Sequence, residues 1–246
     1  MDVIERLAEV LRRAQAGVAF TGAGISTESG IPDFRSPGGV WSRHKPVMYD
    51  DFLRSRGERV RYWKMRAEIY RDFAAARPND GHRALARLEE MGRIVAVVTQ
   101  NIDGLHQDAG SGRVIELHGT SRVIACVLCR KEWPPHVVLA WIKAGDEAPQ
   151  CDECGGPLKS RTISFGQAMP VDEMNEAAAL SLEADVYLAI GSSLVVEPAA
   201  SLPRLAKHHG ATLVVLNQTP TPLDDMADWV IRRPIAATLH ALLQHV

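Results

Sequence analysis

The stretch Phe20-Thr21-Gly22-Ala23-Gly24-Ile25-Ser26-Thr27-Glu28-Ser29-Gly30-Ile31-Pro32-Asp33-Phe34-Arg35 continues a short apolar run that begins at Val18. The apolar run predicts a strand, and Gly22-Ala23-Gly24 predicts a turn whose backbone N–H groups can approach an anion such as a pyrophosphate. An ordinary dinucleotide fingerprint would need glycine in place of Thr27, and a second strand with an acidic residue about 20 residues further on. The segment therefore indicates a phosphate-binding loop of another kind, or a simple tight turn.

The composition is that of a globular protein. The chain has 246 residues, of which 46% are apolar and 24% charged, enough for one large domain or one domain with a small inserted module. The net charge is −2 and no Lys/Arg run occurs, so we expect no direct contact with nucleic acid. Apolar runs have strand length and the first residues begin an amphipathic helix, so we expect no membrane segment and a cytoplasmic location.

Periodicity predicts an alternation of helices and strands. Residues 3–14 have apolar positions at helical spacing, with Asp2 as N-cap and Gly17 as the stop. Residues 94–99 are almost continuously β-branched, as expected of a strand buried on both faces of a parallel sheet. We expect strands over 18–21, 94–99, 114–117, 185–190, 211–217 and 229–231. We expect further helices over 58–76, 80–91, 172–182, 197–209 and 234–244, and mostly loop over 22–57.

This alternation predicts an α/β fold with a doubly wound, Rossmann-like parallel sheet. Ligands on such sheets bind at the carboxyl ends of the strands. Four loops follow predicted strands there, at residues 21–26, 100–103 and 191–193 and at Asn217. We therefore expect them to converge on one crevice.

The four cysteines form two Cys-x-x-Cys pairs. Cys126 and Cys129 are separated by 21 residues from Cys151 and Cys154, which is typical of a tetrahedral four-thiolate zinc site. The alternatives are disulfides, which need an oxidising compartment, and a redox pair, which needs a single motif at a helix start. Four thiolates leave no position for a catalytic water, so we expect structural Zn²⁺ in a module over residues 121–159. Residues 1–120 and 160–246 would form the Rossmann-like domain.

Several motifs occur together in this chain. Thr99-Gln100-Asn101-Ile102-Asp103-Gly104-Leu105-His106 follows the second strand, Glu116-Leu117-His118-Gly119 comes soon after, and the cysteine pairs follow. Together with the opening segment, they resemble the sirtuin family of NAD-dependent protein deacylases, over about residues 18–217. The resemblance implies that NAD is consumed as a co-substrate and that zinc is structural. It implies acyl-lysine protein substrates bound as an added strand, and nicotinamide, free lysine and 2′-O-acyl-ADP-ribose as products.

The resemblance also assigns roles to residues. His118 would be the base that deprotonates a ribose hydroxyl, a task that suits histidine near neutrality, while the other histidines are expected to be structural. Asn101 would orient the nicotinamide ribose and a water, and Asp103 would bind the carboxamide, although both residue types also cap helices. Phe34 would shield the reacting sugar carbon, and Arg35 would hold a phosphate or order its loop. The remaining expected cofactor-binding residues are Gly22, Ala23, Gly24, Ser26, Thr27, Asp33, Gln100, Ile102, Gly191, Ser192, Ser193 and Asn217.

The expected substrate loop, residues 160–170, matches the family only in part. Phe165, Gly166 and Pro170 are kept, whereas Ser164 stands at an aromatic position and Gln167 replaces an acid. We expect Phe165, Gly166 and Val195 to bind substrate, since backbone pairing tolerates such changes.

The acyl preference depends on the helix before Pro78. One branch of the family reads acidic acyl chains with a Tyr-x-x-Arg pair. Here Tyr62 and Arg66 are four residues apart, and Trp63 and Arg66 are three apart. We interpret this face as solvated and expect acetyl or a similar neutral short acyl group.

Three functions remain distinguishable by experiment. The main expectation is protein-lysine deacylation. The alternatives are a mono-ADP-ribosyltransferase and a non-catalytic NAD- or ADP-ribose-binding module. Release of nicotinamide with and without acyl-peptide separates them, and hydrolysis of NAD alone would indicate a glycohydrolase.

Overall fold

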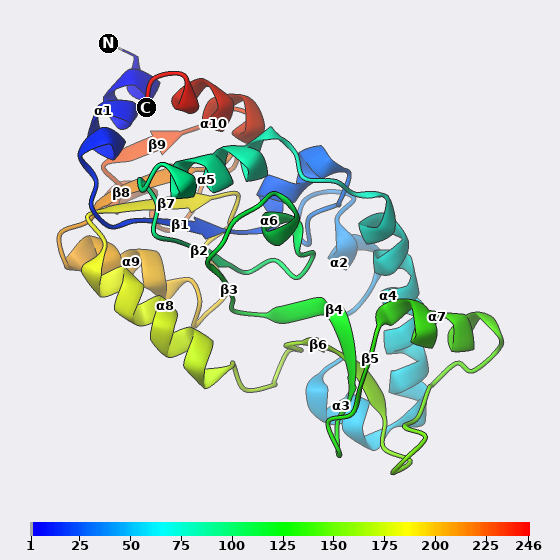
Figure 1. Ribbon diagram of the computed structural model, residues 1–246. Coiled ribbons are helices and arrows are strands. Elements are labelled where there is room, and N and C mark those ends of the chain that lie inside the picture. The colour runs from blue at the N-terminus through cyan, green and yellow to red at the C-terminus, as the bar shows by residue number, and fades with distance from the viewer. Residues whose placement is uncertain (1) are drawn as a thin grey trace.

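A six-stranded parallel sheet forms the centre of the larger of two lobes in the computed structural model, which describes residues 2–246 (Figure 1). The strand order is β3-β2-β1-β7-β8-β9. The strands are β1 (Gly17–Thr21), β2 (Ala96–Thr99), β3 (Val114–Glu116), β7 (Val186–Ile190), β8 (Thr212–Leu216) and β9 (Trp229–Ile231). Each lies where the sequence predicts a strand, and the predicted doubly wound α/β sheet is confirmed.

Helices cover both faces of this sheet (Figure 1). One face is covered by α1 (Val3–Arg13), α5 (Asp80–Glu90) and α10 (Ile235–Leu243), and the other by α8 (Val171–Glu183) and α9 (Ser201–His208). In α1 the predicted N-cap Asp2 forms a capping box with Glu5, and Leu7 and Leu11 are buried against the sheet. Two apolar cores therefore form, one on each face.

The turns after β1 and β7 are in direct backbone contact. A Cβ atom on Gly22 or on Gly24 would lie only 2.8 Å from the carbonyl oxygen of Gly191, and Gly191 itself has a φ of +62°. The N–H of Gly22 donates to Ile190 (3.0 Å) and that of Gly24 to Gly191 (2.8 Å). The two glycines therefore serve close packing of the chain, and their N–H groups are not available to an anion.

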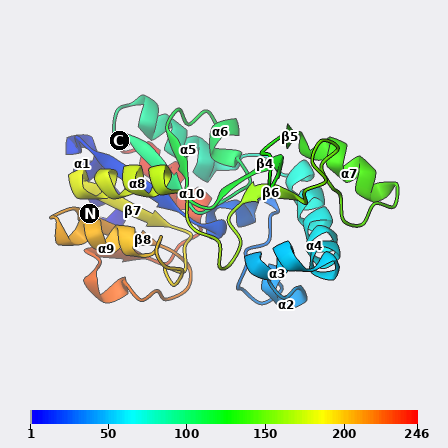
Figure 2. The ribbon, with the colours of Figure 1, turned by 90° about the horizontal axis from the view of Figure 1, so that it is seen from below.

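A second lobe stands beside the main sheet (Figure 2). Its antiparallel sheet has the order β5-β4-β6, with β4 (Gly119–Cys126), β5 (Glu132–Trp133) and β6 (Leu158–Thr162). Its helices are α2 (Val40–Arg43), α3 (Tyr49–Arg54), α4 (Arg56–Ala75) and α7 (Pro135–Lys143). Phe52, Trp63, Ile124 and Leu158 belong to one core that joins these helices to the small sheet. The division at residues 121–159 stays a prediction.

The remaining elements are short. They are η1 (Ala23–Ser29), a 3₁₀ turn in the opening segment, α6 (Leu105–Asp108) and η2 (Asp224–Met226). The helix predicted over 197–209 begins only at Ser201, and the strand predicted over 94–99 begins at Ala96, because Ile94 still bonds back to Leu88 in the turn after α5.

The solvated face expected on α4 is wrong. Tyr62 is 3% exposed and Arg66 4% exposed. Tyr62, Met65, Arg66 and Ile69 follow the i, i+3, i+4, i+7 spacing of a helix face that packs inward. Arg66 donates from Nη2 to the Ser121 hydroxyl of β4 at 2.7 Å, so the face binds the small sheet.

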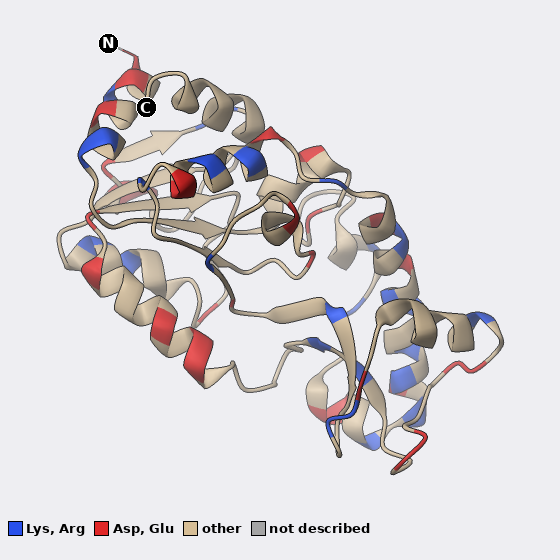
Figure 3. Cartoon of the chain, viewed as in Figure 1, with Lys and Arg blue, Asp and Glu red and all other residues tan. Residues whose placement is uncertain are grey.

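Charged residues of both signs are mixed over the outer helices (Figure 3). Many of their ion pairs are exposed, such as Arg13–Glu9 and Arg113–Glu176, so each contributes only about 0–1 kcal/mol. Among residues 2–246, no helix combines the length and the apolar content that crossing a membrane requires.

The packing of α5 leads to a first prediction. Leu85 is fully buried, so Leu85→Ala should lower the free energy of unfolding by about 2–5 kcal/mol. Leu182→Ala, at a position 45% exposed on α8, should change it by less than about 0.5 kcal/mol. Urea unfolding measures both, and equal effects would contradict the burial of the α5 face.

Candidate active site and zinc centre

A cleft of about 550 Å³ opens at the carboxyl ends of the main strands, between the two lobes. Most of the predicted site residues line it. From the cofactor set these are Gly22, Ala23, Gly24, Asp33, Phe34, Arg35, Gln100, Asn101, Ile102, His118, Gly191, Ser192, Ser193 and Asn217, and from the substrate set Phe165 and Gly166. The predicted convergence of four loops on one crevice is therefore found.

His118 follows β3 and is held by the loop after β2. Its Nδ1–H donates to the carbonyl of Gln100 at 3.0 Å, because a carbonyl only accepts. Nε2 then carries the lone pair. Burial lowers the pKa of His118, the Gln100 bond opposes this, and the charge of Arg35 lowers it further. The imidazole is therefore neutral at pH 7 and can accept a proton at Nε2.

The hydroxyl of Ser26 joins three side chains. It donates to Asp103 Oδ2 (2.8 Å) and accepts from Asn101 Nδ2 (3.1 Å). His82 Nε2 lies 3.4 Å away, and its Nδ1 accepts from the backbone of Asn79, which leaves Nε2 to donate. Since one hydroxyl provides one donor and two acceptor positions, Ser26 is fully used and fixes both loop residues.

Asp103 lies at a smaller pocket that adjoins the cleft. Ala23, Ser26, Asn101 and Ile102 line this pocket with it. Burial raises the pKa of Asp103, while the Leu105 N–H, the Ser26 hydroxyl and the charge of Arg122 act in the opposite direction. The carboxylate is thus partly desolvated but well supplied with donors.

Two further histidines lie beneath these loops. His106 Nε2 bonds Thr21 Oγ1 at 2.9 Å, which in turn donates to Thr99. Burial lowers the pKa of His82 to about 4 and that of His106 to about 3, so both stay neutral. Their hydrogen bonds agree with the structural role expected for them.

The loop after β7 forms the opposite side of the cleft. Gln100 Nε2 donates to the Ser192 hydroxyl at 2.7 Å, which ties the loops after β2 and β7 together. The N–H groups of Ser192 and Ser193 donate to no carbonyl in residues 2–246, so they are free for a phosphate. Thr27 lies outside the cleft lining, and its hydroxyl donates to the carbonyl of Gly24.

Aromatic rings form the outer wall. Trp41 stands between Phe34 and Phe165, with ring centroids 5.3 Å and 5.9 Å apart. The carbonyl of Phe165 accepts from the Tyr49 N–H, and the Gln167 side chain accepts from the Ser164 N–H, so the replaced acid still orders the loop.

Val195, expected to bind substrate, is 53% exposed and stands outside the lining, whereas Val196 is part of it. Tyr62 and Arg66 of α4, which were expected to lie on a solvated face, also line the cleft, and so do Met65 and Ile69, which were not predicted. The helical spacing of these four residues could have identified an inward-facing side of α4. Trp41 was missed as well, because nothing in a segment expected to be loop distinguishes one aromatic residue from another.

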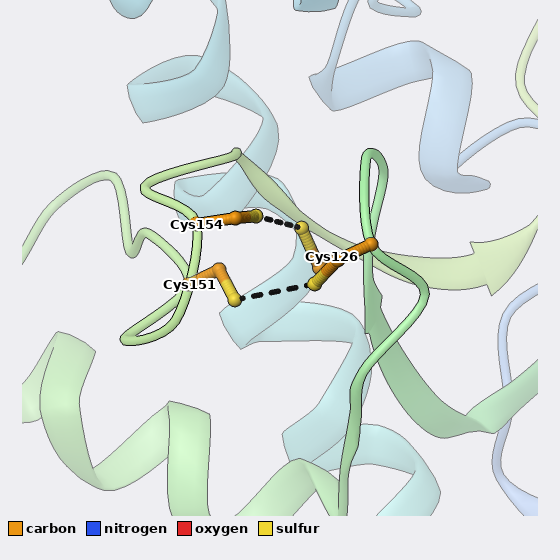
Figure 4. Close-up of side chains that lie close together, drawn as sticks. Cys126, Cys151 and Cys154 are labelled. Carbon is orange, nitrogen blue, oxygen red and sulfur yellow. Dashed lines mark hydrogen bonds between the residues drawn. The ribbon is translucent and has the colours of Figure 1, made fainter.

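The four cysteine sulfurs lie within 4.8 Å of one another (Figure 4). Cys126 and Cys154 are 3.4 Å apart at sulfur, and Cys129 and Cys151 3.5 Å, both far beyond the ~2.05 Å of a disulfide. Zn–S bonds of about 2.3 Å in a tetrahedron place sulfurs about 3.8 Å apart. Burial opposes ionisation of Cys126, but backbone N–H groups and neighbouring thiols outweigh it and lower its pKa to about 7. The donor set fits zinc.

Comparisons with known proteins agree with this geometry. A sequence model of the Sir2 family matches residues 22–198. The chain is 51% identical over 241 residues to NAD-dependent protein deacetylase 1 of Bradyrhizobium diazoefficiens, covering 96% of this chain and 93% of that protein. It is 48% identical over 238 residues to an NAD-dependent protein deacetylase of Rhodopseudomonas palustris, covering 96% and 94%.

Solved structures give the same result. A Sir2 protein with a p53 peptide and NAD⁺ superposes with a TM-score of 0.91 at 37% identity, covering 99% of this chain and 98% of that one. A Sir2 variant with deacetylated p53 peptide and 3′-O-acetyl ADP-ribose gives a TM-score of 0.93 at 37% identity, covering 98% and 97%.

The cysteine cluster leads to a second prediction. Structural zinc contributes about 10–16 kcal/mol to folding of zinc-finger peptides, and a loss of only ~4 kcal/mol would lower the Tm by roughly 8–16 °C. We expect a zinc chelator to do so in thermal unfolding, zinc to restore the Tm, and Cys154→Ser to remove the response. A Tm that responds to a reductant and not to a chelator would instead indicate disulfides.

Proposed function

Since the chain belongs to the Sir2 family, we propose that it is an NAD-dependent protein-lysine deacylase, with acetyl-lysine as its main substrate. The products would be nicotinamide, deacylated lysine and 2′-O-acyl-ADP-ribose. When bound, NAD supplies a labile nicotinamide–ribose bond and the ribose hydroxyl that receives the acyl group. The observation that carries the proposal is His118, a neutral histidine with Nε2 available in a cleft that also holds Asn101 and an aromatic wall.

His118 is the proposed general base. With Nδ1–H fixed on the Gln100 carbonyl, Nε2 takes the proton of a ribose hydroxyl, and the same carbonyl stabilises the resulting imidazolium. Phe34 and Trp41 exclude water from the reacting carbon, which matters because the transition state has oxocarbenium character.

Asn101 and Asp103 are proposed to act on the nicotinamide side. Ser26 fixes both side chains, so the carboxylate of Asp103 is oriented before the carboxamide binds. On the other side of the cleft, Ser192 and Ser193 would offer N–H groups to phosphate and Arg35 would add a positive charge. Asn217, which also lines the cleft, is proposed to contact a ribose.

The acyl-lysine segment is proposed to bind as an added strand between the Phe165–Gly166 loop and the loop carrying Val195. The N–H of Ile163 donates to the carbonyl of His118 at 2.8 Å, so the first loop is attached to the residue after β3 that acts as base. Zinc would be held by the four cysteines and would stabilise the small sheet, because no ligand position is left for chemistry.

Replacement of His118 tests the proposal. With NAD and an acetyl-lysine peptide, mass spectrometry should show deacetylated peptide and equimolar O-acetyl-ADP-ribose. His118→Ala should lower the rate by about 10²–10⁴-fold through loss of the base. The control His240→Ala, at an exposed position on α10, should keep the rate. ADP-ribose attached to protein, with the peptide still acetylated, would favour the transferase, and NAD binding without turnover a non-catalytic module.

A second acyl class is favoured by one observation. Arg66 lines the cleft, is almost fully buried, and its Nε has no hydrogen-bond partner. Lys159 is buried nearby over the Tyr62 ring, and no ion pair with a carboxylate neutralises either cation in the described chain. A buried cation without a counter-ion favours an anionic ligand, here an acyl group that ends in a carboxylate.

Peptides that differ only in the end of the acyl chain test this. If Arg66 binds a carboxylate, kcat/KM for succinyl-lysine should exceed that for butyryl-lysine, and Arg66→Met should lower this ratio about tenfold. Arg71→Met, at an exposed position further along α4, should leave the ratio unchanged. A wild-type preference for butyryl-lysine would contradict the second acyl class and support the neutral one.

A further inference from the structure

One basic side chain at the surface of the molecule binds the loop after β2, which carries Asn101 and Asp103. Arg122 of β4 donates from Nη2 to the carbonyl of Gly104 at 2.8 Å and to the carboxylate of Asp108. We infer that Arg122 is a positioning residue for the reaction: it fixes the loop that carries Asn101 and Asp103 without itself touching the substrates.

The two residues on either side of Asp103 are both bonded to β4. The N–H of Ser121 donates to the carbonyl of Ile102 at 3.0 Å, and the Arg122 guanidinium to that of Gly104. The first bond is made by the backbone and forms whatever residue stands at 121. The second depends on a long side chain that carries several donors, so it is lost when residue 122 is apolar.

Gly104 and Arg122 are fitted to each other. Gly104 has a φ of +76°, and a Cβ atom built there would overlap the guanidinium. The guanidinium thus occupies the space over the loop where a side chain would otherwise stand. This close contact fixes the Gly104 peptide, and with it the Leu105 N–H that donates to Asp103 Oδ1 at 2.9 Å.

Charge acts in the same direction. Arg122 faces the carboxylates of Asp103 and Glu116 and is paired with Asp108. Burial raises the pKa of Asp103, and the positive charge of Arg122 opposes this. Arg122 therefore favours the ionised carboxylate, which is the form that accepts hydrogen bonds from an amide. Its side chain is 45% exposed, so solvent partly screens its charge, and the hydrogen bond to Gly104 contributes more to holding the loop.

The inference rests on the proposed function, because it assumes that Asp103 contacts the nicotinamide amide. Its effect should accordingly fall on NAD and nicotinamide rather than on the peptide. A residue that only stabilised the fold would instead change the parameters of both substrates together with the Tm.

The test compares Arg122→Met and Arg122→Lys with the control Arg113→Met, another half-exposed arginine that pairs with a carboxylate, Glu176, at the edge of the main sheet. Calorimetry gives the Kd of NAD, and turnover of an acetyl-lysine peptide gives KM for both substrates and inhibition by nicotinamide. For Arg122→Met we expect the Kd and KM of NAD and the nicotinamide inhibition constant to rise about tenfold, with the peptide KM within about twofold. In Arg122→Lys these three constants should lie within about threefold of the wild-type values, and in Arg113→Met they should equal them.

An unchanged Kd of NAD in Arg122→Met would overturn the inference. So would a parallel loss of NAD affinity, peptide affinity and Tm that Arg122→Lys does not repair. If the wild type did not turn over the acetyl peptide, the proposed function would fail. The calorimetric comparison of NAD binding would then still decide whether Arg122 holds the loop.

Discussion

The close approach of two turns, after β1 and after β7, is the constraint on which the site depends. Gly22 and Gly24 lie against the backbone of Gly191, and any side chain at these positions would overlap a carbonyl group. Because adjacent parallel strands end at the same edge, this contact sets the two loops side by side at a fixed height. The other loops of the cleft are positioned relative to these two turns.

Hydrogen bonds extend from that contact across the sheet edge. Ser26, just beyond Gly24, joins Asn101 and Asp103, while Gln100 joins Ser192 by its side chain and His118 by its carbonyl. These groups are mostly buried, so water does not compete for them, and a missing partner would leave a costly unsatisfied group. These bonds orient the side chains of the site toward one another, as the proposed stabilisation of developing charge by fixed dipoles requires.

The sequence predicts the scaffold better than the pocket. The six strands follow from short apolar runs, which are typical of a parallel sheet covered on both faces, and the four clustered cysteines follow from spacing alone. His118 is one of nine histidines, and only the resemblance of its motif to a family distinguishes it. The face of α4 that lines the cleft was expected to be solvated, because a charged residue such as Arg66 is usually exposed. The helical spacing of its apolar neighbours nevertheless indicates a buried face. Gly22 and Gly24 were expected to bring N–H groups to an anion, but they serve close packing instead. A turn sequence does not reveal which part of the backbone packs against it.

The position of β1 in the sheet has a consequence for how the protein is made. β1 has β2 on one side, but its other neighbour is β7, and the Gln15 N–H bonds an Asp185 oxygen 170 residues away. At roughly 5–20 residues per second, a ribosome needs several seconds after β2 has emerged to complete β7. During that interval the nascent chain exposes an apolar strand edge, the kind of edge that pairs with other chains. The edge of β1 that pairs with β7 in the finished fold is thus the place where the unfinished chain is most open to aggregation.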